Sequence, residues 1–324
     1  MTHAIRIHQA GGPEVLCWEA VTVPAPAAGE ATVRQHAVGL NFIDVYHRTG
    51  LYPLPMPSGI GLEGAGVVEA VGEGVSEVKV GDRVAYAGGP IGAYAEVRNI
   101  PAHRLLKLPE SISFNTAAAM MLQGLTAAYL LRKTYCVQPG DAVLIHAAAG
   151  GVGLIACQWA KALGAIVIGT VGSAAKGELA KAHGCDHVIN YSTENFTQRV
   201  RNITGGEGVS VVYDGVGKDT FMGSLDCLRP LGMMVSYGNA SGPVPPLDLI
   251  LLSQKGSLFI TRPTIMSYTA KRADLEALGA ELFDVVGSGQ VKIEVNQTYP
   301  LAEAAQAHRD LEARKTTGST ILLP

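Results

Sequence analysis

Residues 141–153 read DAVLIHAAAGGVG, and this stretch decides the fold. An apolar strand runs into a turn of small residues, and an amphipathic helix follows. Laid on the pattern G-x-G-x-x-G, the three glycine positions are Ala148, Gly150 and Gly153. At such a helix start, unpaired backbone N–H groups and the positive end of the helix dipole bind a pyrophosphate. The stretch therefore predicts a dinucleotide site whose phosphate-binding residues are Ala149, Gly150, Gly151 and Val152.

Beyond residue 140 the chain alternates apolar strands with helical segments. The expected strands are residues 142–146, 166–170, 187–189, 209–213, 233–237 and 257–261. The expected helices are residues 151–163, 173–183, 193–203, 218–228 and 249–254. Such alternation is typical of βαβ units, which build a parallel sheet with helices on both faces. We therefore predict a doubly wound α/β domain.

The N-terminal third has a different pattern, in which short strands are separated by glycine and proline. The expected strands are residues 4–8, 16–23, 31–40, 64–71, 83–87 and 94–99. This spacing predicts an all-β barrel or sandwich. The C-terminal tail does not continue the parallel-sheet pattern, and we expect it to return to the first domain. Its expected elements are helices 269–286 and 302–314 and strands 293–299 and 319–323.

Charge and composition exclude several classes of protein. The chain has 25 Lys and Arg against 28 Asp and Glu, a net charge of −3, which argues against nucleic acid as a partner. The longest apolar windows, 117–131 and 147–157, fall short of the about 20 residues of a membrane-spanning helix. The N-terminus lacks the apolar core of a secretory signal, and the five scattered cysteines fit a reducing compartment. We expect a cytoplasmic protein with no membrane partner.

The end of the second expected strand indicates which dinucleotide binds. An NAD site places an acid about twenty residues after the first glycine, where it binds the ribose 2′-hydroxyl. Here the strand runs out through Gly172 and Ser173 without an acid, and Lys176 follows. A hydroxyl and an ammonium group suit a 2′-phosphate. NADP is therefore the predicted cofactor, and Tyr191, just past the third strand, is a further candidate at its adenosine end.

Other candidate residues follow the later strands. In an open parallel sheet, ligands bind at the carboxyl ends of the strands. Asp214, which precedes Gly215 and Val216, is expected to orient the backbone there. The residues predicted at this edge to contact the cofactor are Gly215, Val216, Tyr237, Gly238, Asn239, Arg262 and Pro263.

Four further motifs, together with residues 140–153, occur in an order that resembles the zeta-crystallin-like quinone oxidoreductases of the medium-chain dehydrogenase/reductase superfamily. The motifs are NFIDVY (41–46), GAGVV (64–68), GDRV (81–84) and GLTAAY (124–129). The resemblance spans essentially the whole chain. It implies a Rossmann domain inserted into a GroES-like, mostly-β catalytic domain. We expect residues 1–123 and 262–324 to form the catalytic domain and residues 124–261 the NADP-binding domain.

Zinc-dependent relatives in that superfamily hold a catalytic metal through cysteine and histidine, and this sequence departs from them. The position that resembles their first ligand is Asn41, and their Gly-His-Glu motif reads Gly61-Leu62-Glu63. An amide or an alkyl chain does not replace a thiolate or an imidazole around zinc. No metal is therefore expected. The predicted reaction passes a hydride, or successive electrons, from NADPH to a quinone, which accepts a hydride without a Lewis acid.

The polar and aromatic segment 41–52, expected as a loop, carries the predicted catalytic residues. By resemblance, Asn41 and Tyr46 lie near the nicotinamide, with Asp44 in the same cluster, and Tyr52 lines the acceptor cleft. Asn41 would donate a hydrogen bond to the developing oxyanion, and the tyrosines would stack on a flat ring. The remaining predicted cofactor contacts are Thr126, Tyr129 and, near the 2′-phosphate, Arg314.

Other functions remain open from the sequence. Relatives with similar zinc-free clefts reduce activated alkenes such as enones, and some bind single-stranded nucleic acid, which the −3 charge disfavours here. A non-catalytic structural role, as in lens crystallins of this lineage, would give NADPH binding without turnover. The resemblance also suggests a homodimer, which would pair edge strands near residues 257–261.

Overall fold

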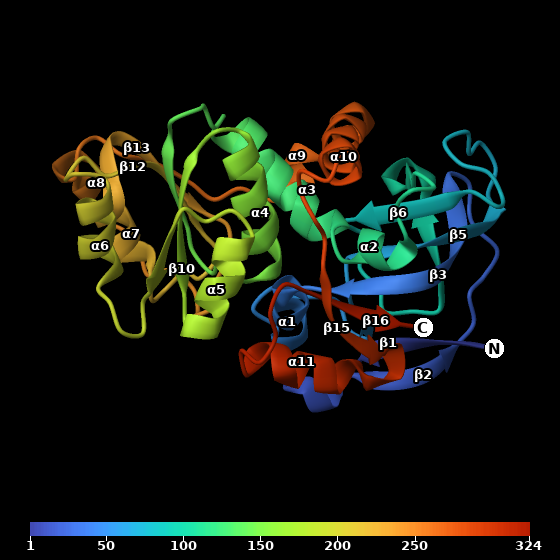
Figure 1. The fold of residues 1–324 in the computed structure, drawn as a ribbon. Coiled ribbons are helices and arrows are strands. Elements are labelled where there is room, and N and C mark those ends of the chain that lie inside the picture. The colour runs from blue at the N-terminus through green and yellow to red at the C-terminus, as the bar shows by residue number, and fades with distance from the viewer. The chain divides into compact units, whose positions relative to one another are not determined.

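The computed structural model describes residues 1–324 and divides them into two compact units (Figure 1). The first unit contains Met1–Leu125, Tyr268–Gly287 and Ile293–Pro324. The second unit contains Thr126–Ser267 and Ser288–Lys292. The chain therefore forms the second unit in the middle of its length and then returns to the first.

Two sheets make up the first unit. Its strands are β1 (Thr2–Ile7), β2 (Cys17–Val21), β3 (Glu30–Leu40), β4 (Ser58–Gly59), β5 (Glu63–Val71), β6 (Arg83–Ala87), β7 (Val97–Pro101), β8 (Leu106–Lys107), β15 (Val295–Pro300) and β16 (Ser319–Leu323). The larger sheet has the order β15-β16-β3-β5-β6-β8, with β7 paired to β3, and the smaller one has the order β2-β1-β4. In Figure 1 the red C-terminal strands lie beside the blue N-terminal ones, and Thr320 pairs with Leu40. The tail thus completes the N-terminal sheet.

Helices complete the first unit, and one of them corrects an expectation. The helices are α1 (Phe42–Thr49), α2 (Phe114–Ala118), α10 (Arg272–Gly287) and α11 (Ala304–Glu312), while α3 (Met121–Tyr129) and α9 (Ile265–Tyr268) cross the join between the units. The prediction of a loop over 41–52 was wrong, because α1 occupies most of it. Asp44, His47 and Arg48 are buried in it together with Val45 and Tyr46, so burial in this helix is not confined to an apolar stripe. No helix in the structure has both the length and the apolar character needed to cross a membrane.

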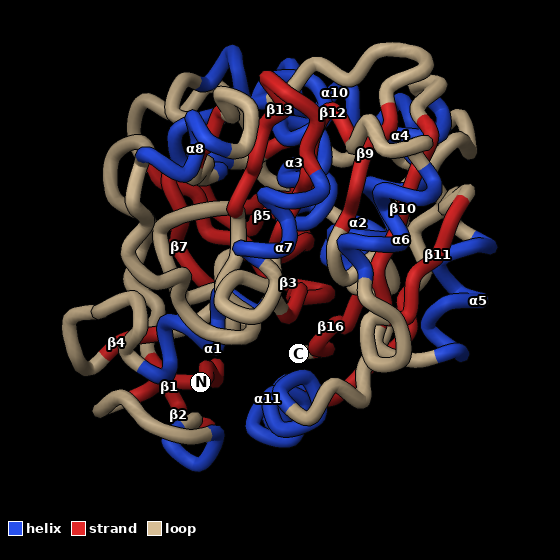
Figure 2. Tube along the Cα trace, turned by 90° about the vertical axis from the view of Figure 1, so that its left-hand side faces the viewer, coloured by secondary structure: helices blue, strands red, loops and turns tan.

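The second unit is a parallel six-stranded sheet, as predicted. Its strands are β9 (Ala142–Ile145), β10 (Ile166–Val171), β11 (His187–Asn190), β12 (Val209–Asp214), β13 (Leu228–Ser236) and β14 (Phe259–Thr261). Its helices are α4 (Gly151–Ala162), α5 (Ala174–Ala182), α6 (Phe196–Ile203), α7 (Phe221–Cys227) and α8 (Ile250–Gln254). Helices α4 and α5 cover one face, and α6 and α7 cover the other (Figures 1 and 2).

The strand order places a ligand edge in this sheet. The order is β11-β10-β9-β12-β13-β14, so the chain builds outward from β9 on one side and then crosses to β12 on the other. Ligands of such sheets bind beyond the carboxyl ends of the strands where this reversal occurs. The apolar interior beneath that edge includes Leu144, Ile168 and Val212, all fully buried. A rigid core thus supports the loops that follow β9, β10 and β12.

Candidate active site

The predicted phosphate loop connects β9 to α4 at the carboxyl edge of the sheet. Gly150 is the N-cap of α4, with extended backbone, and its N–H donates to the carbonyl of Ala147 at 2.8 Å. A Cβ at Gly153 would lie 2.3 Å from the Ala147 carbonyl oxygen and 2.8 Å from the Ala148 Cα, so only glycine fits there. The first N–H groups of α4 have no acceptor within the helix. The loop therefore presents backbone donors in a place that suits a pyrophosphate.

A second cluster lies where β10 ends. Ser173 caps α5, and its hydroxyl accepts a hydrogen bond from the backbone N–H of Lys176 at 3.4 Å. A Cβ at Gly172 would lie 2.8 Å from the hydroxyl of Tyr191. The structure therefore brings together four residues that the sequence predicted for the adenosine end of the cofactor: Gly172, Ser173, Lys176 and Tyr191.

The loop after β12 is held by the acid that precedes it. The Oδ1 atom of Asp214 accepts hydrogen bonds from the backbone N–H groups of Val216 at 2.7 Å and Gly217 at 3.0 Å. Its Oδ2 atom accepts one from the Thr220 hydroxyl at 2.8 Å. The expectation that Asp214 orients the backbone here is confirmed.

The loops after β13 and β14 close against the same edge. A Cβ at Gly238 would lie 2.3 Å from the carbonyl oxygen of Gly215, and a Cβ at Gly215 would lie 2.9 Å from the Tyr237 ring. The Nη1 atom of Arg262 donates to the backbone carbonyls of Ser236 at 3.0 Å and Gly238 at 2.9 Å. Arg262 thus ties the end of β14 to the end of β13.

A buried histidine that sequence reasoning did not single out links these strand ends. The Nδ1 atom of His146 lies 2.8 Å from the Thr170 hydroxyl, and its Nε2 atom lies 2.9 Å from the Ser224 hydroxyl. Ser224 also donates to Asp214 at 3.3 Å. His146 is fully buried, and burial lowers the pKa of its imidazole. A neutral ring therefore joins β9 and β10 to Asp214, the acid at the end of β12.

In the first unit, the candidate centre is Asn41, which two buried carboxylates hold. The carboxylate of Asp44 accepts from the backbone N–H of Asn41 at 2.9 Å, and the carboxylate of Glu63 accepts from its side-chain amide at 2.6 Å. The amide of Gln123 donates to the Asn41 side-chain oxygen at 3.2 Å. The amide nitrogen carries two hydrogens, so one N–H remains for a ligand.

The electrostatics of this centre are unusual. Burial raises the pKa of Asp44 to about 7 and that of Glu63 to about 8. Both side chains are fully buried. Hydrogen bonds from Asn41 act in the opposite direction on both groups, and each favours the carboxylate form. Near neutral pH the site therefore sits close to a change of charge, which is common where chemistry takes place.

Aromatic side chains from α1 and the residues after it lie together. The rings of Tyr46 and Tyr52 meet edge to face with centroids 5.2 Å apart, and His47 meets Tyr52 in the same way at 6.0 Å. Tyr46 is almost fully buried, at 7% exposure. The Nδ1 atom of His47 is buried without a hydrogen-bond partner, and burial lowers the pKa of this ring. The structure thus brings Tyr46 and Tyr52 together, with His47 as an additional member.

The remaining predicted residues are spread over other elements. Thr126 and Tyr129 are buried on α3 in the part that belongs to the second unit. Asn239 and Pro263 lie in the segments after β13 and β14. Arg314 follows α11 in the first unit and has a φ of 58°, a left-handed conformation that a residue with a side chain adopts at a cost.

Sequence reasoning missed several groups that shape the first unit's centre. Glu63 was noted only for its missing histidine neighbour, and Gln123 was not singled out. Neither stands near Asn41 in the sequence, and only the pairing of β3 with β5 and the position of α3 bring them to it. No three His, Cys, Asp or Glu side chains gather to hold a metal ion.

Two family descriptions match the chain. The description "Alcohol dehydrogenase GroES-like domain" matches residues 27–110, and "Zinc-binding dehydrogenase" matches residues 151–283. The first match lies in the first unit, and the second begins at the start of α4. These matches agree with a Rossmann-type domain inserted into a GroES-like one.

Whole-chain relatives narrow the family. The chain is 55% identical to a quinone oxidoreductase of Pseudomonas aeruginosa over 100% of both chains. It is 48% identical to a 2-haloacrylate reductase of a Burkholderia species, with 100% of this chain and 99% of the relative covered. The crystal structure of the Escherichia coli quinone oxidoreductase complexed with NADPH superposes with a TM-score of 0.98 at 52% identity, covering 99% of this chain and 100% of that one. The chain belongs to the quinone oxidoreductase family of the medium-chain dehydrogenase/reductases.

Proposed function

We propose that the protein transfers reducing equivalents from NADPH to a quinone. The observation that carries this proposal is the edge of the second unit's sheet, where a glycine loop and a helix start are followed by Ser173 and Lys176 in place of an acid. Family membership supports the same function, because the relatives at 52 to 55% identity include quinone oxidoreductases. We assign most of the cofactor contacts to the second unit, and the acceptor chemistry to the first.

Features of the glycine loop support binding of the cofactor pyrophosphate there. A side chain at Gly153 would collide with the loop backbone, and the helix start leaves N–H donors for the pyrophosphate. We propose that the pyrophosphate is held by Ala149, Gly150, Gly151 and Val152, and the 2′-phosphate end by Gly172, Ser173, Lys176, Tyr191 and Arg314. We assign the nicotinamide half to Asn41, Asp44, Tyr46, Thr126, Tyr129, Gly215, Val216, Tyr237, Gly238, Asn239, Arg262 and Pro263.

When bound, NADPH supplies the hydride, and a proton completes reduction of the quinone to the hydroquinone. Asn41 has one amide N–H beyond the one that Glu63 accepts, and we propose that it donates to the oxygen on which charge develops. Tyr46 and Tyr52 offer ring faces and hydroxyl groups, which suit a planar acceptor. Catalysis is thus assigned to Asn41, Tyr46 and Tyr52.

Absorbance at 340 nm tests the function, with NADPH or NADH, a panel of quinones, and a chelator present throughout. We expect quinone-dependent oxidation that prefers NADPH and that the chelator leaves unchanged. Lys176→Ala should raise the KM for NADPH about tenfold and leave the KM for NADH unchanged. Lys181→Ala is the matched control, since Lys181 lies on the same helix and pairs with Glu178 at 3.1 Å. Bound NADPH without turnover of any quinone would refute the proposal.

A second candidate function is reduction of an activated alkene. The Burkholderia relative, at 48% identity, is named a 2-haloacrylate reductase. A simple enone and 2-chloroacrylate therefore belong in the same assay. Turnover of these substrates with none of the quinones would favour this second function.

We also propose a homodimer in the cytoplasm. The edge strand β14 has one neighbour in its sheet, and large apolar side chains are exposed around it. Leu231, Leu249, Ile250 and Phe259 are 66%, 71%, 53% and 57% exposed. Such a patch suits pairing with a second copy. Sedimentation should show a dimer that Phe259→Lys dissociates and Val80→Lys, a change at an exposed valine of the first unit, does not.

A further inference from the structure

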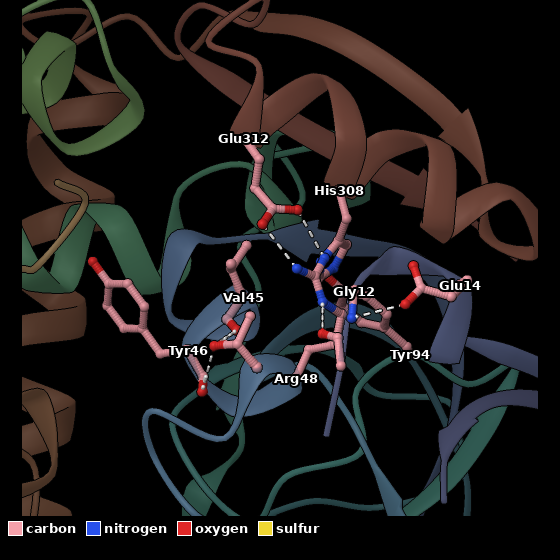
Figure 3. A network of polar contacts seen from close by, with 10 residues as sticks. Gly12, Glu14, Val45, Tyr46, Arg48, Tyr94, His308 and Glu312 are labelled. Carbon is pink, nitrogen blue, oxygen red and sulfur yellow. Dashed lines mark hydrogen bonds and ion pairs between the residues drawn. The ribbon is translucent and has the colours of Figure 1, made fainter. Parts of the chain in front are cut away.

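A network of buried polar side chains joins helix α11 to helix α1 in the first unit (Figure 3). Arg48 on α1 lies with its Nη1 atom 3.0 Å from the Nδ1 atom of His308 on α11. The Nε2 atom of His308 lies 3.2 Å from the Tyr94 hydroxyl, which donates to the Oδ2 atom of Asp44 at 2.9 Å. Arg48 is 1% exposed, and the other three side chains are fully buried. Sequence positions more than 200 residues apart therefore share one continuous network.

The direction of every hydrogen bond in this network is fixed. A guanidinium group only donates, so the Nδ1 atom of His308 must accept. Burial, together with the charge of Arg48, lowers the pKa of His308 to about 3, and the ring is neutral. Its single hydrogen is then on Nε2, which donates to the Tyr94 oxygen. The donors therefore run from Arg48 through His308 and Tyr94 to Asp44.

Arg48 is itself held by two residues outside this network, Glu312 and Gly11. Its guanidinium donates to both carboxylate oxygens of Glu312, at 2.9 and 2.8 Å, and its Nε donates to the carbonyl of Gly11 at 3.1 Å. A bidentate pair of this kind fixes the plane of the guanidinium group. Figure 3 shows Glu312 and His308 approaching Arg48 from the same helix. Arg48, the first donor of the network, is thus held in one orientation.

Asp44, the last residue of the network, contacts the candidate centre. The Oδ2 atom of Asp44 accepts from Tyr94 and from the backbone N–H of Asn41, while its Oδ1 atom is buried without a partner. The two donors on one oxygen fix the rotation of the carboxylate and favour its ionised form. Asp44 in turn holds the backbone at which α1 begins.

We infer that His308 and Tyr94, aligned by Arg48, are positioning residues that keep Asp44 as the acceptor fixing Asn41 for the reaction. This inference rests on the proposed function, in which Asn41 contacts the acceptor. None of the three residues needs to touch the substrate. Their effect passes through the orientation and ionisation of one carboxylate.

The titration of Asp44 reports on this role. Burial raises its pKa to about 7, and the hydrogen bonds from Asn41 and Tyr94 lower it from what burial alone would give. Loss of the Tyr94 hydroxyl should therefore raise the pKa further, by about one pH unit. The titratable and charged groups around Asp44 are His47 and Arg48 on α1, Glu63 on β5, Tyr94 between β6 and β7, and His308 and Glu312 on α11.

The test compares Tyr94→Phe with Tyr86→Phe in the full chain with NADPH bound. Tyr86 is also fully buried in the first unit, but its hydroxyl donates to Gln35, outside this network. Infrared difference spectra follow the buried carboxylic acid during a pH titration, and Asp44→Asn identifies its band. We expect the midpoint in Tyr94→Phe to rise by about one pH unit. The acid limb of kcat/KM should move by the same amount, and Tyr86→Phe should change neither.

His308 supplies the second pair of variants. His308→Gln can still accept from Arg48 and donate to Tyr94, whereas His308→Leu can do neither. We expect the leucine variant to reproduce the shift of Tyr94→Phe and the glutamine variant to restore most of the wild-type midpoint. Equal midpoints in wild type, Tyr94→Phe and His308→Leu would overturn the inference. Absence of quinone-dependent turnover in the wild type would instead refute the proposed function, and the infrared titration would still decide the inference.

Discussion

The two units build their candidate sites from different parts of the chain. The second unit uses backbone groups within short stretches that follow neighbouring strands, at residues 146–153, 170–173 and 214–217. The first unit uses side chains from distant positions, and Asn41, Glu63, Tyr94, Gln123 and His308 all belong to it. A backbone site depends on local geometry and small residues. A side-chain site depends on the correct packing of the whole unit.

The largest expected effect tests the backbone site. Gly153→Ala places a Cβ 2.3 Å from the Ala147 carbonyl oxygen, and the nearest atoms are all backbone atoms of the loop, which cannot rotate away as a side chain can. We expect a loss of about 3 kcal/mol in the free energy of unfolding, and NADPH affinity reduced about a hundredfold. Denaturant titration and fluorescence titration with NADPH measure the two quantities. Gly287→Ala, a glycine with no heavy atom within 4 Å of its Cβ position, should change neither.

Two buried histidines allow a direct comparison between the units. His308 lies between Arg48 and Tyr94, whereas His146 lies between the hydroxyls of Thr170 and Ser224. A hydroxyl can rotate toward another partner, and a buried guanidinium cannot discard its charge. We therefore expect His308→Leu to cost about 3 kcal/mol of stability and His146→Leu about 1 to 2 kcal/mol.

Denaturant titrations at pH 7.5 compare the two histidine variants. If His146→Leu proved the more destabilising of the two, the second unit would depend on buried side chains as strongly as the first. The contrast between a backbone site and a side-chain site would then fail.

The same contrast explains how far the sequence could be interpreted. Most strands and helices of the second unit were predicted to within three residues at each end, since each element carries its own apolar period and the glycine loop has a local signature. The exception is β13, which begins at Leu228, five residues before the expected start. Helix α1 was missed because Asp44, His47 and Arg48 are buried in it alongside the apolar Val45 and Tyr46. A helix that buries polar side chains is recognised only when the hydrogen-bond partners of those side chains are known.

The partners of Asn41 could not be predicted for a related reason. Glu63 and Asp44 are buried acids without a direct cation, and nothing in their own neighbourhoods in the sequence distinguishes them from surface acids. Their position follows from the pairing of β3 with β5, which depends on contacts along the entire sheet. The sequence therefore indicated a candidate segment for the reaction, but not the electrostatics that surround it.

The last expected effect, about 1 kcal/mol for each pH unit, concerns the charge in the side-chain site. Asp44 has a pKa of about 7 in the folded protein, raised by burial from the model-compound value of 3.8. Between these two values the folded state keeps a proton that the unfolded chain releases. The free energy of unfolding therefore falls as pH rises through this window, and above pH 7 the penalty is constant.

Asp44→Asn isolates that contribution. Its side-chain oxygen can accept from both Tyr94 and Asn41, while its amide takes the position of the partnerless Oδ1 atom. Denaturant titrations from pH 4 to pH 8 should give a difference between wild type and variant that grows by about 1 kcal/mol per pH unit and levels off near pH 7. Glu63 remains in both proteins, and because the charge of Asp44 contributes to its raised pKa, the difference includes that coupling as well as the titration of Asp44 itself. A difference that stays flat across the window would mean that Asp44 is already ionised at pH 4, and the charge of the side-chain site would then be fixed by its hydrogen bonds instead of by burial.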